Sequence, residues 1–242
     1  MGRSIAEALH AAGATVALID YSASVRETAL AIDAEGKTAL PFVADLSDRS
    51  QIDRVFGEVM EAFGGRLDIL VNNAGITRRH RPEVFPREDW DAVISVNLNA
   101  VWFLSQLAGQ VMLEQHYGKI INIASMSSYF GGTTVPPYTA DKHGVAGLTK
   151  ALSNDWAGQG ICVNAIAPGF FSGKQNAALL WNPDGTPTAR TKKILAATPM
   201  GRFGQAEELL GALLFLLNNE AASFVTGVVI PVDGGFSAYS GV

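Results

Sequence analysis

The sequence contains one cysteine and no long apolar run, which argues against a disulfide-stabilised protein and against a membrane-spanning one. Cys162 has no second cysteine with which to form a disulfide within the chain. It lies in the apolar stretch GICVNAIAPG, where a packed thiol in a reducing compartment is expected. The run ALLFLL near the end is far shorter than the roughly 18 residues that a membrane span requires. Since no secretory signal precedes the first expected helix, we expect a cytoplasmic protein without a membrane partner.

Charged residues are also scarce, at 17% of the 242 residues, and acids and bases are interspersed. The net charge of −5 gives no basic surface that would hold nucleic acid or anionic lipid. The four histidines and one cysteine form no cluster with metal-ligand spacing, so no metal site is expected. The sequence therefore favours a small-molecule partner.

Apolar runs typical of strands alternate with helical segments along the whole chain. The sequence predicts strands at 15–20, 39–45, 67–75, 119–125, 162–169 and 227–235. It predicts helices at about 2–12, 22–35, 48–63, 88–116, 137–158 and 205–218. This alternation indicates a Rossmann-like α/β fold, a doubly wound parallel sheet with helices on both faces, formed by residues 1–242 as a single domain. The turn-rich stretch 170–200 follows a predicted strand and is interpreted as a substrate lid.

Short motifs occur in a fixed order along these elements. They are NNAG at 72–75, Ser125, YTADK at 138–142 and PG at 168–169. Tyr138 and Lys142 are four positions apart on a predicted helix and share one face. Together these motifs resemble the short-chain dehydrogenase/reductase family, with its Tyr-x-x-x-Lys motif, and the resemblance extends from Gly2 to the C-terminus. It implies a nicotinamide-dependent oxidoreductase that acts on CH–OH groups.

The resemblance also implies catalytic roles. Tyr138 would exchange a proton with the substrate oxygen, and the positive charges of Lys142 and of the nicotinamide would favour the tyrosinate. Ser125, at the end of a predicted strand, would orient and polarise the carbonyl. Asn97 matches the position that supports a water beside the lysine, although it could instead be a residue that locally interrupts a helix. Ser127 is open to two interpretations, a substrate contact or a turn residue.

Cofactor binding is predicted from the first helix and the strand after it. Asp20 ends that strand 18 positions after Gly2, close to the spacing of about 20 residues between a phosphate-binding glycine and a ribose-binding acid. A turn role for Asp20 is the alternative. Because a carboxylate accepts a hydrogen bond from a 2′-hydroxyl but repels a 2′-phosphate, NAD is favoured over NADP. The resemblance adds further cofactor contacts at Asp45, Leu46, Asn72, Ala74, Gly75, Tyr138, Lys142, Pro168 and Gly169.

One departure from the family concerns the N-terminal region. Members normally begin with a strand and a Thr-Gly-x-x-x-Gly-x-Gly turn, of which only Gly2 is present here. We expect the sheet to lack this first strand, which would leave apolar surface and backbone groups of its neighbours uncovered. Met1 is then interpreted as an internal methionine of a longer product. The alternative is a short, non-catalytic relative that serves as a binding or regulatory subunit.

The substrate prediction starts from the basic run TRRHR that directly follows NNAGI. A loop that begins at the carboxyl end of a strand reaches the substrate cleft, where Arg79 would suit a carboxylate. A solvated charge run is the other interpretation.

Sequence segments such as GKIINIASM resemble those of the sugar-acid branch of the family, the 2-deoxygluconate 3-dehydrogenases, gluconate 5-dehydrogenases and mannonate oxidoreductases. This implies a ketone and secondary alcohol of a C6 sugar acid, with fructuronate and mannonate ahead of ketogluconate and gluconate. A 3-oxoacyl carrier-protein reductase is the alternative, and Asp20 and the acidic net charge disfavour it. The resemblance also implies a homotetramer.

Overall fold

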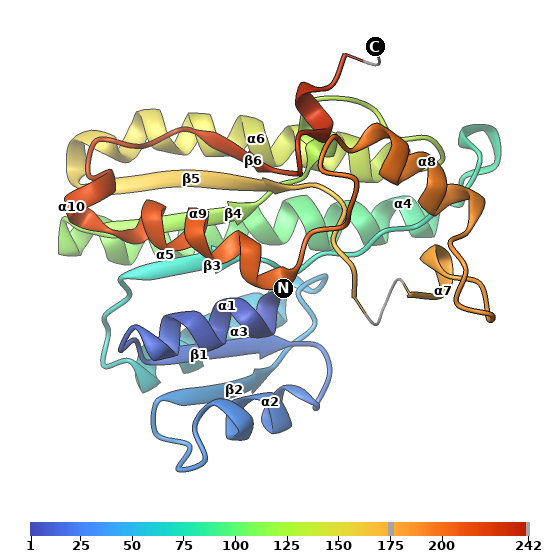
Figure 1. The fold of residues 1–242 in the computed structure, drawn as a ribbon. Coiled ribbons are helices and arrows are strands. Elements are labelled where there is room, and N and C mark those ends of the chain that lie inside the picture. The colour runs from blue at the N-terminus through green and yellow to red at the C-terminus, as the bar shows by residue number, and fades with distance from the viewer. Residues whose placement is uncertain (174–176, 241–242) are drawn as a thin grey trace.

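Parallel strands form the centre of the molecule in the computed structural model, which describes residues 1–173 and 177–240 (Figure 1). The strands are β1 (Val16–Asp20), β2 (Ala39–Val43), β3 (Ile69–Asn72), β4 (Gly118–Ile123), β5 (Ile161–Pro168) and β6 (Val229–Val232). Every pairing among them is parallel, in the orders β1-β2 and β3-β4-β5-β6. The predicted Rossmann-like α/β class is confirmed.

Helices cover both faces of the strands. They are α1 (Gly2–Ala11), α2 (Val25–Ile32), α3 (Arg49–Ala62), α4 (Arg87–Ile94), α5 (Ala100–Gln115), α6 (Pro136–Trp156), α7 (Ala177–Leu180), α8 (Ala189–Ala197), α9 (Leu210–Leu217) and α10 (Asn219–Ala222). On one face, Ile121 of β4 joins a buried cluster with Ile5 of α1 and Leu213 of α9. On the other face, the next residue back, Ile120, packs with Met112 of α5. This alternation is the period of two that a strand buried on both faces requires.

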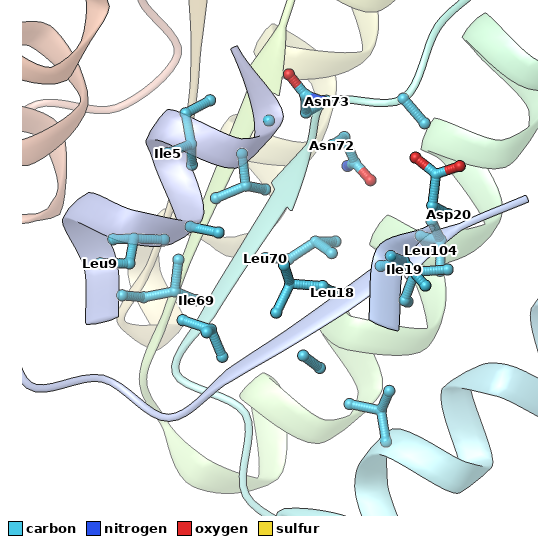
Figure 2. A pocket seen from close by; sticks show the side chains of 18 of the residues that line it. Ile5, Leu9, Leu18, Ile19, Asp20, Ile69, Leu70, Asn72, Asn73 and Leu104 are labelled. Atoms are coloured by element: carbon cyan, nitrogen blue, oxygen red, sulfur yellow. The ribbon is translucent and has the colours of Figure 1, made fainter. Parts of the chain in front are cut away.

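The sheet is interrupted between β1 and β3. Within the described residues, β1 pairs only with β2, and β3 pairs only with β4 on the other side. A cavity of about 770 Å³ lies between the two unpaired edges, lined by apolar side chains such as Leu18 and Leu70 (Figure 2). The uncovered apolar surface expected from a missing strand is therefore present here. Three of its polar side chains, Asp20, Asn72 and Asn73, lie at the carboxyl ends of β1 and β3.

A long helical run packs against β3 and β4 where the sequence predicts one helix over 88–116. It consists of α4, a π-helical turn at Ser95–Asn99 and α5. By length and composition alone the run Arg87–Gln115 could cross a membrane, but 44% of its most apolar window is buried inside the fold. Val101 and Leu104 belong to two of the apolar clusters buried there. The run is therefore packed as a core helix.

Helical structure also occupies part of the predicted lid, where the sequence suggested only an irregular stretch. That expectation was wrong for α7 and α8. Thr188 caps α8, because its hydroxyl oxygen accepts a hydrogen bond from the Thr191 amide at 3.2 Å. Leu180 and Ile194 are buried against Phe203, which attaches both helices to the body of the fold. Residues 174–176 of the predicted lid lie outside the described residues.

The apolar helix α9 is a core helix on one side only. Leu213 and Leu216 are completely buried, whereas Leu214 and Phe215 are 41% and 42% exposed. Core packing of Leu213 and Leu216 therefore accounts for part of the apolar character of α9. The homotetramer that the resemblance implies stays a prediction.

Candidate active site

Three of the predicted catalytic side chains meet beyond the carboxyl end of β4. Ser125 follows β4 and caps a short 3₁₀ turn, Met126–Ser128. Two prolines, Pro136 and Pro137, open α6, and its first two turns carry Tyr138 and Lys142. The Lys142 Nζ lies 5.6 Å from the centroid of the Tyr138 ring. The structure therefore brings together the serine, tyrosine and lysine that the sequence singled out.

Burial dominates the proton affinity of this group. It raises the pKa of Tyr138, while the hydrogen bond from Ser125 and the charge of Arg79 lower that pKa. Burial also lowers the pKa of Lys142, whose Nζ donates a 2.8 Å hydrogen bond to the Ile123 carbonyl. The sequence predicted that Lys142 would favour the tyrosinate. Within the chain itself the net shift runs the other way, so Tyr138 keeps its proton near neutral pH.

Asn97 occupies the π-helical turn and is completely buried. Its Oδ1 accepts a hydrogen bond from the Ile76 amide, and its Nδ2 donates to the Ile76 carbonyl, both at 2.8 Å. This two-point clamp fixes the segment that follows β3. A Cβ at the neighbouring Gly75 would lie 3.4 Å from Asn97 Oδ1 and 4.0 Å from Lys142 Nζ, so the clamped segment runs directly beside the lysine. The interpretation of Asn97 as a helix interruption is correct, and the π-helical turn is also what places it at the site.

Asp141 is a residue of this site that the sequence reasoning missed. It is completely buried, and its Oδ2 accepts a 2.8 Å hydrogen bond from Asn97 Nδ2. Burial raises its pKa to about 7, against the lowering effects of the Lys142 charge and the Asn97 hydrogen bond. Acidic residues on helices usually face solvent, so the sequence YTADK did not indicate that Asp141 is buried.

The two serines after Ser125 have structural partners. The Ser127 amide donates to Ser125 Oγ at 3.1 Å, and Ser128 Oγ donates to the Lys142 carbonyl at 2.6 Å. Ser127 therefore has the turn role that one interpretation gave it. Its contact with substrate stays a prediction.

Part of the predicted cofactor site lines the cavity between β1 and β3. The cofactor residues that line it are Gly2, Asp20, Leu46, Asn72 and Ala74. The first turn of α1 reaches the end of β3, since a Cβ on Gly2 would lie only 2.8 Å from Asn73 Nδ2. The positive end of a helix and a polar strand edge thus meet at one mouth of the cavity.

Two carboxamide oxygens at this mouth, Asn72 Oδ1 and Asn73 Oδ1, are buried and have no hydrogen-bond partner among the described residues. The Asn72 amide nitrogen donates to Ser105 and Asn122, which gives this residue a structural role as well. Asp20 accepts a 2.8 Å hydrogen bond from the Ser22 amide, as its turn interpretation requires, and its carboxylate still lines the cavity. Orphaned acceptors, a helix N-terminus and a carboxylate fit the polar half of a dinucleotide.

The remaining predicted cofactor residues lie outside the cavity lining. The Asp45 carboxylate accepts hydrogen bonds from the amide and hydroxyl of Ser47 at 2.9 and 2.7 Å. Pro168 ends β5, and the Gly169 amide donates to the Val232 carbonyl at 3.0 Å. A Cβ on Gly169 would lie 2.6 Å from Asp233 Cβ, so close packing against the end of β6 requires this glycine. Their cofactor roles stay predictions.

The basic run after β3 is mostly paired locally. Arg78 and His80 both contact Asp89, and Arg81 contacts Glu83, as in a solvated charge run. Arg79 differs, because none of the described residues offers it an acidic partner. Burial and the charge of Arg190, on α8, lower its pKa, whereas the effect of Tyr138 raises it. Arg190 was missed from the sequence, since nothing there relates α8 to this loop.

Known proteins match the chain over nearly its whole length. A family model described as enoyl-(acyl carrier protein) reductase matches residues 1–237. The 2-dehydro-3-deoxy-D-gluconate 5-dehydrogenase of Bacillus subtilis strain 168 is 44% identical over 236 residues, 98% of this chain and 90% of that protein. The chain belongs to the short-chain dehydrogenase/reductase family, a class of nicotinamide-dependent oxidoreductases.

Two solved structures show the same fold with different cofactors. A proposed NAD(P)-dependent gluconate 5-dehydrogenase from Beutenbergia cavernae, with NADP bound at low occupancy, is 41% identical with a TM-score of 0.89 and covers 98% of this chain and 92% of its own. A proposed D-mannonate oxidoreductase from Haemophilus influenza, with bound NAD, is 36% identical with a TM-score of 0.89 and covers 99% of this chain and 92% of its own. The choice between NAD and NADP therefore does not follow from membership of the family.

The Asn97 clamp predicts a measurable loss of stability. Asn97→Ala leaves the amide and carbonyl of Ile76 without their partner, and we expect the free energy of unfolding to fall by about 1–3 kcal/mol. Asn99→Ala is the matched control, because Asn99 is an exposed residue of the same turn. Urea titrations followed by circular dichroism measure both variants. Equal stabilities of the two variants would contradict the clamp.

Proposed function

We propose that the protein is an NAD(H)-dependent dehydrogenase that interconverts a ketone and a secondary alcohol of a C6 sugar acid. The observation that carries this proposal is the convergence of Ser125, Tyr138 and Lys142 with an arginine, Arg79, whose charge acts on the same tyrosine. The first three are suited to chemistry at a carbonyl oxygen. The arginine is suited to an anionic group elsewhere on the substrate.

The topology supports a cofactor position between β1 and β3. From β1 the chain moves outward to β2, and from β3 it moves in the opposite direction to β4, so the strand order reverses between them. Dinucleotides bind outside the carboxyl ends of parallel strands at such a reversal. There the N-terminus of α1 would receive the pyrophosphate and Asp20 the adenosine ribose. Asp45 and Leu46 would contact the adenine, and Pro168 and Gly169 would lie beside the nicotinamide.

Asp20 supports NAD as the preferred cofactor. Its carboxylate lines the cavity, and the next three residues, Tyr21, Ser22 and Ala23, supply no positive charge that would offset a 2′-phosphate. When bound, the nicotinamide supplies or accepts the hydride. The chain's own residues must then bind the substrate and move the accompanying proton.

In ketone reduction, Tyr138 would donate its phenolic proton to the substrate oxygen. The raised pKa suits this direction, because the phenol is protonated at neutral pH. Ser125 would hydrogen bond to the same oxygen and stabilise its developing charge. In alcohol oxidation the roles reverse, so turnover in that direction should rise with pH as Tyr138 loses its proton.

The sugar-acid assignment depends on Arg79 together with Arg190. The charge of Arg190 lowers the pKa of Arg79, and neither guanidinium has an acidic partner among the described residues, so together they are suited to a carboxylate. The relatives named for gluconate and mannonate chemistry support the same substrate class, with fructuronate and mannonate our first choice. A carrier-protein reductase is a weaker alternative. Asp20 disfavours NADPH as the cofactor, and the net charge of −5 disfavours binding of an acidic carrier protein.

Removal of one hydroxyl tests the reaction. We expect Tyr138→Phe to lower kcat by at least about 100-fold, because positioned proton transfer contributes about 10²–10⁴ to a rate. NADH binding should stay within about twofold of the original, since the ring is retained. Tyr117→Phe is the control, because the Tyr117 hydroxyl accepts a hydrogen bond from Asn219 and lies at the opposite end of β4 from Ser125. Undiminished turnover in Tyr138→Phe would refute the proposed role.

Removal of one positive charge tests the substrate class. We expect Arg79→Ala to raise KM for a sugar acid by about 10-fold or more, the loss expected for a charge-assisted hydrogen bond. The uncharged sugar analogue should be unaffected. Arg81→Ala is the control, because Arg81 already has Glu83 as its partner. Steady-state kinetics with both substrates decide the matter, and equal effects of Arg79→Ala on both would exclude a carboxylate contact.

A further inference from the structure

A buried acid lies beside the catalytic lysine without a full set of hydrogen bonds. Asp141 is completely buried; its Oδ2 accepts from Asn97, and its Oδ1 has no partner among the described residues. Burying a carboxyl group with an unpaired oxygen costs free energy, so such an arrangement in a folded protein calls for an explanation. Neither the proton transfer nor the substrate contact described above uses this carboxyl group.

Asp141 is linked to the reaction through two routes. Through Asn97 it fixes the orientation of the amide that clamps Ile76, and the clamped segment runs beside Lys142. Through its charge it acts on both catalytic groups, because an ionised Asp141 raises the pKa of Lys142 and of Tyr138. The first route depends on the shape of the side chain and the second on its ionisation, so the two can be separated by substitution.

Other ionisable groups near Asp141 are few. The elements packed against α6 include α4, the π-helical turn, α5, the 3₁₀ turn after β4 and β5. The two turns carry no ionisable side chain apart from hydroxyl groups. The other elements carry Arg87, Glu88, Asp89, Asp91, Glu114 and Cys162, and α6 itself adds His143, Lys150 and Asp155, none of them buried. Asp141 also has Tyr138 and Lys142 beside it on α6, and the charge that lowers its pKa is that of Lys142.

We propose that Asp141 is a positioning residue for the dehydrogenase reaction: its hydrogen bond holds Asn97, and its carboxyl group, next to Lys142 and about one helical turn from Tyr138 on α6, adds a negative charge to the site when it is ionised. When Asp141 is neutral, its carboxyl group contributes no negative charge against the loss of the phenolic proton, and the tyrosinate needed for alcohol oxidation forms more easily. When Asp141 is ionised, its negative charge opposes the loss of the phenolic proton. The residue therefore restrains oxidation as the pH rises.

Two substitutions separate the hydrogen bond from the charge. Asp141→Asn keeps an acceptor for Asn97 and removes ionisation, whereas Asp141→Leu removes both at similar volume. For Asp141→Asn we expect the pH profile of alcohol oxidation to shift to lower pH by about one unit, the size expected for one charge several ångströms away in a protein interior. Its plateau rate should be retained. For Asp141→Leu we expect the plateau kcat to fall at least about fivefold, with NADH affinity nearly unchanged.

These activity measurements rest on the proposed function, and a melting experiment keeps the inference testable without it. The pKa of about 7 in the folded protein lies above the ordinary value of 3.8, so the folded state retains a proton that the unfolded chain releases. Stability of the original protein should therefore fall as the pH rises from about 4 to 7, relative to Asp141→Asn. The Tm difference between the two proteins should grow over that range and then stay level.

The outcomes are distinct. A shifted profile in Asp141→Asn together with a lowered plateau in Asp141→Leu supports the proposal. An unshifted profile in Asp141→Asn overturns the charge role, and an unchanged plateau in Asp141→Leu overturns the positioning role. If the chain turns over none of the sugar acids, the proposed function fails, and the melting curves alone decide whether Asp141 holds a proton: a constant Tm difference from pH 4 to 9 overturns the inference.

Discussion

The parallel register of β3, β4, β5 and β6 is the constraint on which the rest of the structure depends. Asn72 pairs with Asn122, Ile123 with Ile166, and Pro168 with Val232, so the strands end along one edge. Ser125 and the chain segments after β3 and β5 leave from that edge and meet the first turns of α6. A shift of the strand register by one residue would turn strand side chains to the opposite face of the sheet, and the site would no longer form.

Burial, more than any single charge, determines the chemistry at this edge. It raises the pKa of Tyr138 and of Asp141 and lowers that of Lys142, so each of these groups is biased toward its neutral form. A neutral phenol is a proton donor ready for ketone reduction. Arg79, whose charge lowers the pKa of Tyr138, has no acidic partner among the described residues and lies where we propose that a carboxylate binds.

Much of the fold follows from the sequence, because periodicity and apolar content fix where strands and long helices form. Every predicted strand is present, and the predicted helix at 137–158 is observed at Pro136–Trp156. The Tyr138–Lys142 spacing placed both side chains on one helix face. The failures have a common cause: the burial of Asp141, the π-helical turn around Asn97 and the approach of Arg190 to Arg79 all depend on tertiary contacts between distant segments. Helix α8 differs from these failures, because the threonine that caps it, Thr188, could have been recognised from the sequence.

Because the sheet is interrupted between β1 and β3, the proposed function depends on whether the cavity there binds the cofactor. Its proposed polar contacts lie at one mouth of the cavity between β1 and β3, where Gly2, Asp20 and the unpaired oxygens of Asn72 and Asn73 meet. The most direct test is a fluorescence titration of the 242-residue chain with NADH and, in parallel, with NADPH. We expect saturable NADH binding at least about tenfold tighter than NADPH binding, a difference of about 1.4 kcal/mol. Absence of NADH binding by the folded chain, or tighter binding of NADPH, would contradict this expectation.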